Sequence, residues 1–204
     1  MLYQDTVILV FAKAPIEGKV NTRLIPDIGV HAATQLQFDL LHQRLSMLFA
    51  AELCEVRLMC APDTSHVCFT SCAGQYGVSL LKQKGDNLGQ RMHQAVAQAL
   101  QQYRYCVVVG TDAPALDSVQ INQVIEKLHE GTAVVFIPAE DGGYVLIGVD
   151  QVYDCLFNDI DWGTERVMQQ SRDQLKKNII SYEELSVCWD IDRFADYQRY
   201  LAMK

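Results

Sequence analysis

The sequence predicts an α/β domain with a mostly parallel sheet and helices on both of its faces. Short runs rich in Val and Ile alternate along the chain with segments whose apolar residues repeat every three to four positions. Such repeated units place their strands in parallel, because each helix returns the chain to the same end of the sheet. The 204 residues show no internal repeat, low-complexity tract or linker, so we expect a single domain over residues 1–204.

The first half of the chain predicts three strands and two helices. The expected strands are Thr6–Ala12, Val56–Cys60 and Val78–Leu81. Residues 34–49 and 87–102 have the helical period, and Asp86 or Asn87 can cap the second helix. The apolar faces of the two helices consist of Leu36, Leu40, Leu41, Leu45 and Leu48, and of Leu88, Met92, Val96 and Leu100.

The second half predicts a strand from Tyr105, a helix, and two strands joined by a glycine turn. Asp117 and Gln120 form a capping box at the start of this helix. Its apolar face consists of Ile121, Val124, Ile125 and Leu128. The apolar runs 133–138 and 144–149 flank Asp141-Gly142-Gly143, which favours a type I′ turn and an antiparallel insertion. The tail predicts a helix over residues 164–176, a strand near residues 186–191 and a short closing helix.

The net charge of −8 disfavours general binding to nucleic acid or to anionic membranes, because both need a basic surface. A small anionic ligand is compatible with this charge if local cations or a carboxylate-bound divalent cation offset it. No apolar run reaches the length of about 18 residues that a membrane span needs, and Met1–Asp5 lacks the basic start of a signal peptide. We therefore expect a cytoplasmic protein.

The seven cysteines are odd in number, and several of them lie inside apolar runs. This pattern is typical of reduced thiols in a core. His66, Cys68 and Cys72 form one group of metal-ligand residue types, but their spacing fits no zinc knuckle and no second ligand pair follows. We expect no metal at these three residues.

An acidic residue follows the strand that begins at Tyr105. In YCVVVGTDAP the apolar run ends in Gly-Thr, and Asp112 comes next. The carboxyl ends of the strands in an open α/β sheet face the crevice where ligands bind. Because Asp117 already caps the following helix, Asp112 is free of that role. We therefore predict that Asp112 is a metal ligand.

A basic loop follows the first strand. Lys13, Lys19 and Arg23 surround Gly18, whose missing side chain lets the backbone approach a phosphate closely. The alternative is a solvated loop without a ligand.

Other segments admit two interpretations. Arg91 is either a phosphate contact or a surface charge, and Trp162 is either a core residue or a platform for stacking. Asp190 and Asp192 share one face if the tail is extended, which suits converging carboxylates, but they could instead cap the last helix.

These segments, taken in order, resemble one family over nearly the whole chain. The sequence is similar to bacterial glycosyltransferase-A-like proteins once grouped as a domain of unknown function and related to nucleotide-diphospho-sugar transferases. Some of those proteins are described as arsenosugar-biosynthesis glycosyltransferases. The motifs that carry the resemblance are FAKAPIEGKVNTRL, GDNLGQRM, GTDAPAL, PAEDGGYVLIG, WGT and DID.

The resemblance implies a Rossmann-like nucleotide-diphospho-sugar transferase fold of the glycosyltransferase A (GT-A) type. It implies a divalent metal, Mg²⁺ or Mn²⁺, held by Asp112 and Asp192, with Asp112 and Asp141 as catalytic carboxylates. The positions that it implies for nucleotide binding are Lys13, Gly18, Lys19, Arg23 and Arg91. Those that it implies for the acceptor side are Gly142, Gly143, Trp162, Gly163 and Thr164.

The chain departs from the family pattern at three places. Glu17 stands where relatives usually have proline, and Asn21 stands where they have lysine, so the first loop carries less positive charge. The tail reads DIDRFADY where relatives tend to have a DTP-like turn.

The sequence therefore predicts a metal-dependent transferase that uses an activated nucleotide, with a nucleotide sugar as the donor and a small molecule as the acceptor. One alternative is a nucleotidyltransferase that releases pyrophosphate from a nucleoside triphosphate, as the more distantly similar 2-phospholactate guanylyltransferases do. Another is a non-catalytic nucleotide-binding module. Fold alone does not choose among these.

Overall fold

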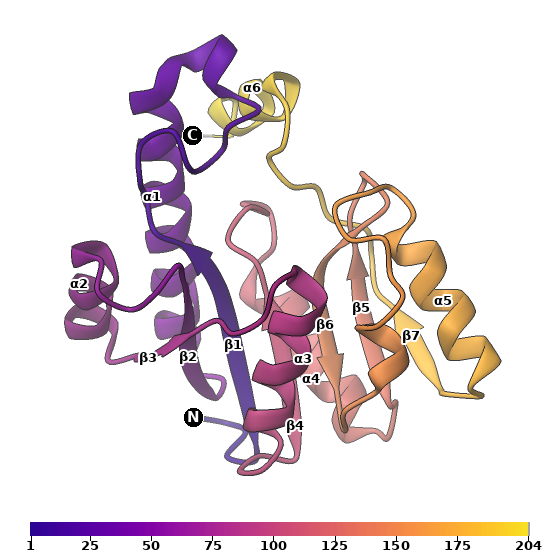
Figure 1. The fold of residues 1–204 in the computed structure, drawn as a ribbon. Coiled ribbons are helices and arrows are strands. Elements are labelled where there is room, and N and C mark those ends of the chain that lie inside the picture. The colour runs from indigo at the N-terminus through magenta and orange to yellow at the C-terminus, as the bar shows by residue number, and fades with distance from the viewer. Residues whose placement is uncertain (204) are drawn as a thin grey trace.

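The computed structural model describes residues 1–203, which form one sheet of seven strands in the order β3-β2-β1-β4-β6-β5-β7 (Figure 1). Strand β6 is antiparallel to both of its neighbours, and the other pairs are parallel. This arrangement confirms the predicted mostly parallel sheet with a small antiparallel insertion. The strands are β1 (Thr6–Lys13), β2 (Glu55–Ala61), β3 (Ser79–Lys82), β4 (Tyr105–Val109), β5 (Val134–Pro138), β6 (Tyr144–Val149) and β7 (Tyr182–Glu184).

Helices cover both faces of the sheet. Residues of α1, α2 and α4 form one core cluster with the sheet, and residues of α3 and α5 form a second cluster on the other face. Strand β1 contributes Ile8 and Val10 to the first cluster and Val7 and Leu9 to the second, as the alternation of side chains along a strand requires. The helices are α1 (Ile25–Ala51), α2 (Val67–Tyr76), α3 (Leu88–Ala99), α4 (Ser118–His129), α5 (Val167–Lys177) and α6 (Phe194–Leu201), with a 3₁₀ turn η1 (Asp154–Leu156).

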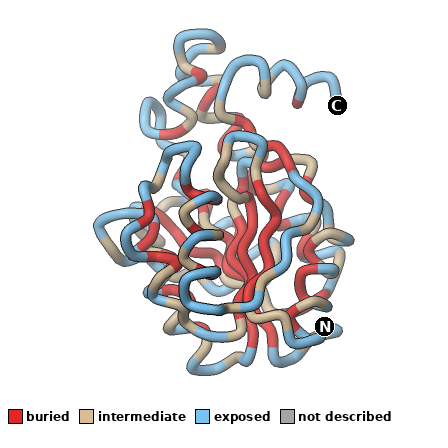
Figure 2. The backbone as a smooth tube through the Cα atoms, turned by 90° about the vertical axis from the view of Figure 1, so that its right-hand side faces the viewer, coloured by how far each residue is buried: buried red, intermediate tan, exposed pale blue. Residues whose placement is uncertain are grey.

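The start of α1 and the end of the chain form a third apolar cluster beyond the sheet. Figure 1 shows α6 beside the first turns of α1, above the upper end of β1. Leu24, Trp189 and Tyr200 are buried in this cluster. In Figure 2 the buried backbone is concentrated in the sheet, while this upper part is largely exposed. The third cluster thus forms a wall next to the carboxyl ends of the parallel strands.

Helix α2 was not predicted from the sequence. Its buried face consists of Cys68, Phe69 and Cys72, and this short group lacks the leucine repeat that marks α1. Helix α1 itself begins earlier than expected, at Ile25, and is interrupted at Gly29, whose φ is 81°.

The strand predicted near residues 186–191 is wrong. A strand forms instead at β7, and the predicted segment makes only an isolated bridge between Ala139 and Cys188. The apolar alternation at Trp189 and Ile191 has a different cause, because both side chains pack into the third cluster and not against the sheet.

The predicted helix caps of α3 and α4 are confirmed. The Asn87 side chain accepts a hydrogen bond from the Gln90 amide, and Asp117 and Gln120 form the expected capping box. Within residues 1–203, no helix has the length and apolar character needed to cross a bilayer.

Candidate functional site

Four carboxylates gather at the carboxyl end of the parallel strands. Asp112 follows β4, and Asp141 follows β5. The tail then passes across this edge, where the Ile191 amide donates to the Asp112 carbonyl oxygen at 2.9 Å. This contact brings Asp190 and Asp192, on either side of Ile191, next to the strand ends.

The strand ends border a cleft of about 650 Å³. Its lining is strongly acidic, with six carboxylate residues and two arginines. The lining residues are Arg23, Glu140, Asp141, Gly163, Thr164, Glu165, Trp189, Asp190, Asp192, Arg193 and Asp196. An anionic ligand in this cleft would need a cation to offset the charge of the lining.

The pKa values of two carboxyl groups reflect this crowding. Asp112 keeps contact with solvent, but the protein groups packed around it displace part of its water and so raise its pKa. The charge of Asp141 acts in the same direction, and Arg44 and Lys13 act against it. Burial raises the pKa of Asp190 to about 7, and the charges of Asp112 and Asp141 act in the same direction. Carboxylate oxygens are the ligands that Mg²⁺ and Mn²⁺ prefer.

Asp192 is held by a cation of the first loop. Arg23 Nη1 donates to both carboxylate oxygens of Asp192, at 2.6 and 2.8 Å, and Arg193 Nε lies 3.3 Å from one of them. Because the Arg23 side chain is 56% exposed, this ion pair contributes little to stability. The Arg23 guanidinium is therefore accessible to another anion. Asp190, which the sequence suggested only as a partner of Asp192, is the tail residue whose pKa responds to Asp112 and Asp141.

The other cations predicted for the nucleotide do not line the cleft. Lys13 ends β1 close enough to Asp112 to lower its pKa, while Gly18 and Lys19 are exposed in the following loop. Arg91 Nε donates to the Gly85 carbonyl oxygen at 2.9 Å and so fixes the turn before α3. Of the predicted loop residues, only Arg23 reaches the lining.

The Asp141-Gly142-Gly143 segment packs against the loop that contains Gly163 and Thr164. The predicted type I′ turn is wrong: it needs two consecutive residues with positive φ, and here only Gly142 has one, at 90°. The longer loop spans residues 139–143 and closes with a hydrogen bond from the Ala139 amide to the Gly143 carbonyl. The Met168 amide donates to the Gly142 carbonyl oxygen at 2.9 Å, which ties the loop to α5.

Trp162 points into the protein and not into the cleft. It packs with the α3/α5 core cluster, and its ring lies edge-on to Tyr144 at a centroid distance of 6.2 Å. A side chain on Gly89 would collide with the Trp162 indole. Trp162 therefore anchors the loop, while Gly163 and Thr164 face the cleft.

Arg44 is a residue that the sequence reasoning missed. Its side chain is buried in α1, and it donates to the carbonyl oxygens of Leu116 and Ala113 at 2.7 and 2.6 Å. These bonds hold the loop that follows Asp112. One feature of the sequence could have identified Arg44. It lies four positions from both Leu40 and Leu48, so it is a cation on the apolar face of the helix.

We expect Asp190→Asn to stabilise the protein in a pH-dependent way. The unfolded Asp has a pKa of about 3.9, so between roughly pH 4 and 7 the unfolded chain ionises while folded Asp190, with its pKa of about 7, keeps its proton. Asp190 therefore costs stability as the pH rises through this window, and asparagine removes the cost. Urea denaturation should show a gain on the order of 2 kcal/mol at pH 8 and a smaller gain at pH 5. A gain at pH 8 that is no larger than the gain at pH 5, or a loss of stability at pH 8, would contradict the crowding of these carboxylates.

Comparison with known proteins places the chain in a family. A family model described as an uncharacterised protein conserved in bacteria (DUF2064) matches residues 44–164. The chain belongs to this family. The part matched by DUF2064 includes Asp112, Asp141 and the loop of Gly163, while Arg23 and Asp192 lie outside it. No curated protein matches the chain.

Solved structures share the fold of this DUF2064 member over nearly its full length. A candidate nucleotide-diphospho-sugar transferase from Desulfovibrio desulfuricans G20 is 26% identical, with a TM-score of 0.85 over 93% of this chain and 83% of the other. The 4-diphosphocytidyl-2C-methyl-D-erythritol synthase from Anaerococcus prevotii is 10% identical, with a TM-score of 0.63 over 98% and 99% of the two chains.

A third structure was determined with ligands. It is glucosyl-3-phosphoglycerate synthase from Mycobacterium tuberculosis in complex with Mn²⁺, UDP and glucosyl-3-phosphoglycerate. It is 10% identical, with a TM-score of 0.55 over 98% of this chain and 76% of the other. The three comparisons confirm a Rossmann-like GT-A fold, which is the fold of transferases that use nucleotides.

Proposed function

We propose that the protein is a divalent-cation-dependent glycosyltransferase that moves a sugar from a nucleotide sugar to a small acceptor. The observation that carries the proposal is the acidic cleft at the carboxyl end of the sheet, beside Asp112, where burial and nearby carboxylates raise the pKa values of Asp112 and Asp190. Ligands bind at this edge in open α/β sheets, and carboxylates crowded there suit a metal-bridged diphosphate. The 26% identity to a candidate nucleotide-diphospho-sugar transferase supports the same conclusion.

The carboxylates have separate proposed roles. Asp112 and Asp192 would hold Mg²⁺ or Mn²⁺, with Asp190 as a further oxygen ligand. When bound, the cation would offset the charge that builds on the departing nucleoside diphosphate. Asp141, on the loop across the cleft, would accept a hydrogen bond from the incoming hydroxyl of the acceptor.

The basic residues would serve the nucleotide. If Asp192 binds a cation, Arg23 can leave its exposed ion pair with Asp192. Its planar guanidinium would then donate two hydrogen bonds to a phosphate. Lys13, already close to Asp112, would add charge at the same edge, and Gly18, Lys19 and Arg91 would complete the nucleotide side. Gly142, Gly143, Gly163 and Thr164 would form the acceptor side, with Trp162 as the anchor of that loop.

A second candidate is nucleotidyl transfer. The match to the 4-diphosphocytidyl-2C-methyl-D-erythritol synthase from Anaerococcus prevotii covers 98% of this chain, although its identity of 10% supports the fold alone. In such a reaction the same cleft would bind a nucleoside triphosphate, and pyrophosphate would leave. A nucleotide-binding module without catalysis is the third candidate.

One assay separates the three candidates. The protein is incubated with Mg²⁺ or Mn²⁺, a panel of nucleotide sugars or nucleoside triphosphates, and small hydroxylated acceptors. We expect release of a nucleoside diphosphate from one nucleotide sugar, dependent on the cation. Pyrophosphate from a triphosphate would favour nucleotidyl transfer. Binding of nucleotide by calorimetry without either product would favour the module.

A further inference from the structure

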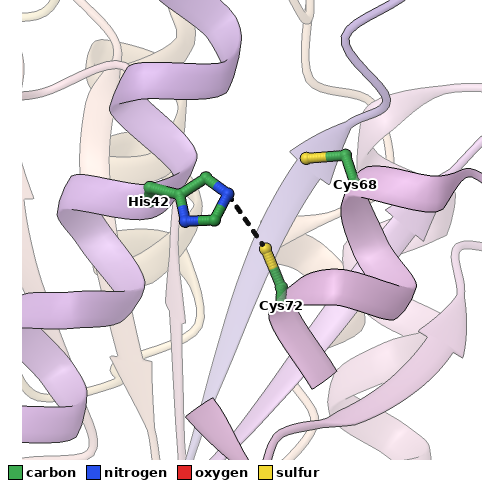
Figure 3. A group of neighbouring side chains, drawn as sticks. All are labelled: His42, Cys68 and Cys72. Carbon is green, nitrogen blue, oxygen red and sulfur yellow. Dashed lines mark hydrogen bonds between the residues drawn. The ribbon is translucent and has the colours of Figure 1, made fainter. Parts of the chain in front are cut away.

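A histidine and two cysteines meet between α1 and α2, and none of them lines the acidic cleft. Figure 3 shows His42 pointing from α1 toward α2, with the sulfur atoms of Cys68 and Cys72 directed into the space between the helices. The Sγ and imidazole nitrogen atoms of the three residues lie within 4.8 Å of one another. Among residues 1–203, this is the one group of three His, Cys, Asp or Glu side chains that meets so closely.

We propose that His42, Cys68 and Cys72 bind a thiophilic d¹⁰ metal ion, Zn²⁺ or Cu⁺, between α1 and α2. One imidazole and two thiolates are the soft donors that such ions select. The sequence grouped the two cysteines with His66 and argued against a metal, because that spacing fits no zinc knuckle and no second ligand pair follows. That histidine has another role, since its Nδ1 accepts a hydrogen bond from the Cys68 amide and caps α2.

The distances fit a shared ion. His42 Nε2 lies 3.7 Å from Cys72 Sγ. An ion bonded at about 2.3 Å to sulfur and about 2.0 Å to nitrogen, with an angle of about 110–120° between the bonds, sets these atoms roughly 3.5–3.8 Å apart. Cys68 and Cys72 are four residues apart on α2, so both sulfur atoms lie on the same face of that helix. The separation of His42 Nε2 and Cys72 Sγ therefore already suits a shared ion, and Cys68 Sγ lies within 4.8 Å of both atoms.

The second ring nitrogen of His42 also has a partner. His42 Nδ1 lies 3.0 Å from the Tyr76 hydroxyl, and the ring packs on Phe38 at a centroid distance of 4.3 Å. With its proton on Nδ1, His42 donates to Tyr76 and presents the Nε2 lone pair to Cys72. A second-shell contact of this kind fixes both the tautomer and the orientation of the ring.

The ion would have a structural effect. His42 belongs to α1, while both cysteines belong to α2, so a bound ion would cross-link two helices that cover the same face of the sheet. An ion that binds the folded state alone raises its stability by mass action. The proposal is independent of the transferase proposal, because it predicts stabilisation without a nucleotide.

The test uses the full chain, reduced with a phosphine and freed of metal. It is titrated with Zn²⁺ against a chromophoric chelator and, anaerobically, with Cu⁺ against bicinchoninate. We expect one equivalent of at least one ion and a rise in Tm of about 5 °C or more at a hundredfold excess over Kd. Cys72→Ala and His42→Gln should each lower the affinity at least tenfold, while Cys106→Ala, another buried thiol, and Cys155→Ala, a more exposed one, should not.

The contrary results are equally clear. If the parent binds neither ion, or if both Cys72→Ala and His42→Gln bind as tightly as the parent, the three residues are ordinary core side chains. Circular dichroism of the metal-free variants checks their folding. If Cys72→Ala does not fold, His42→Gln decides the matter, because His42 is only half-buried and its loss leaves the thiols in place.

Discussion

Asp112→Asn is expected to lower cation-dependent transfer by on the order of a hundredfold or more and to abolish the effect of Mn²⁺ on nucleotide binding. The substitution keeps the shape of the side chain and removes the charge with which Asp112 would hold the proposed cation at the end of β4. Losses of this size are typical when one group that stabilises developing charge is removed. Product release in the assay described above and calorimetry with and without Mn²⁺ measure the two effects.

The matched control for this variant is Asp117→Asn. Asp117 lies five positions further along the chain, and its carboxylate caps α4. Asparagine caps helices as well as aspartate does, so both activity and stability should stay close to those of the parent. Equal activity of Asp112→Asn and the parent would remove Asp112 from the site, whereas equal loss in both variants would indicate a general effect of charge.

Gly142→Ala is expected to destabilise the protein by about 2–4 kcal/mol, with a fall in Tm of roughly 5–15 °C. Two causes act together. The positive φ of 90° is a conformation that residues with a side chain rarely adopt, and the new methyl group would collide with the Glu165 carbonyl. Guanidinium denaturation, followed by circular dichroism, measures the loss.

Gly131→Ala separates these causes. Gly131 also has a positive φ, at 101°, but a methyl group there would have no heavy atom within 4 Å. Its cost should therefore be that of backbone strain alone, about 1–2 kcal/mol. If Gly142→Ala costs no more than Gly131→Ala, the loop of residues 139–143 does not pack on the loop of Gly163 and Glu165 as described.

The sequence allowed prediction of the sheet and of the edge where the site lies. The end of a buried strand is a local property, so the place of Asp112 at the mouth of the sheet could be predicted from YCVVVGTDAP. The capping box of α4 could be predicted for the same reason, because Asp117 and Gln120 are close in the chain.

Contacts between distant segments could not be predicted in this way. No local pattern indicates that Arg44 reaches the loop of Ala113, or that His42 takes the place expected of His66 beside the two cysteines. The same limit affected the tail. Its alternating apolar residues resembled a strand, but Trp189 and Ile191 alternate because one side of the segment packs against α1 and α6.

The ion pair of Arg23 and Asp192 has a consequence for the order of folding. The two residues are 169 positions apart, so nearly the whole chain must be in place before the cleft is closed. Contacts of such high sequence separation form late, because the entropy of closing the loop must be overcome first. A partly folded chain with an intact sheet would therefore have Asp112 but no complete cleft. Nucleotide would then recognise the finished fold alone, and ligand binding would report complete folding.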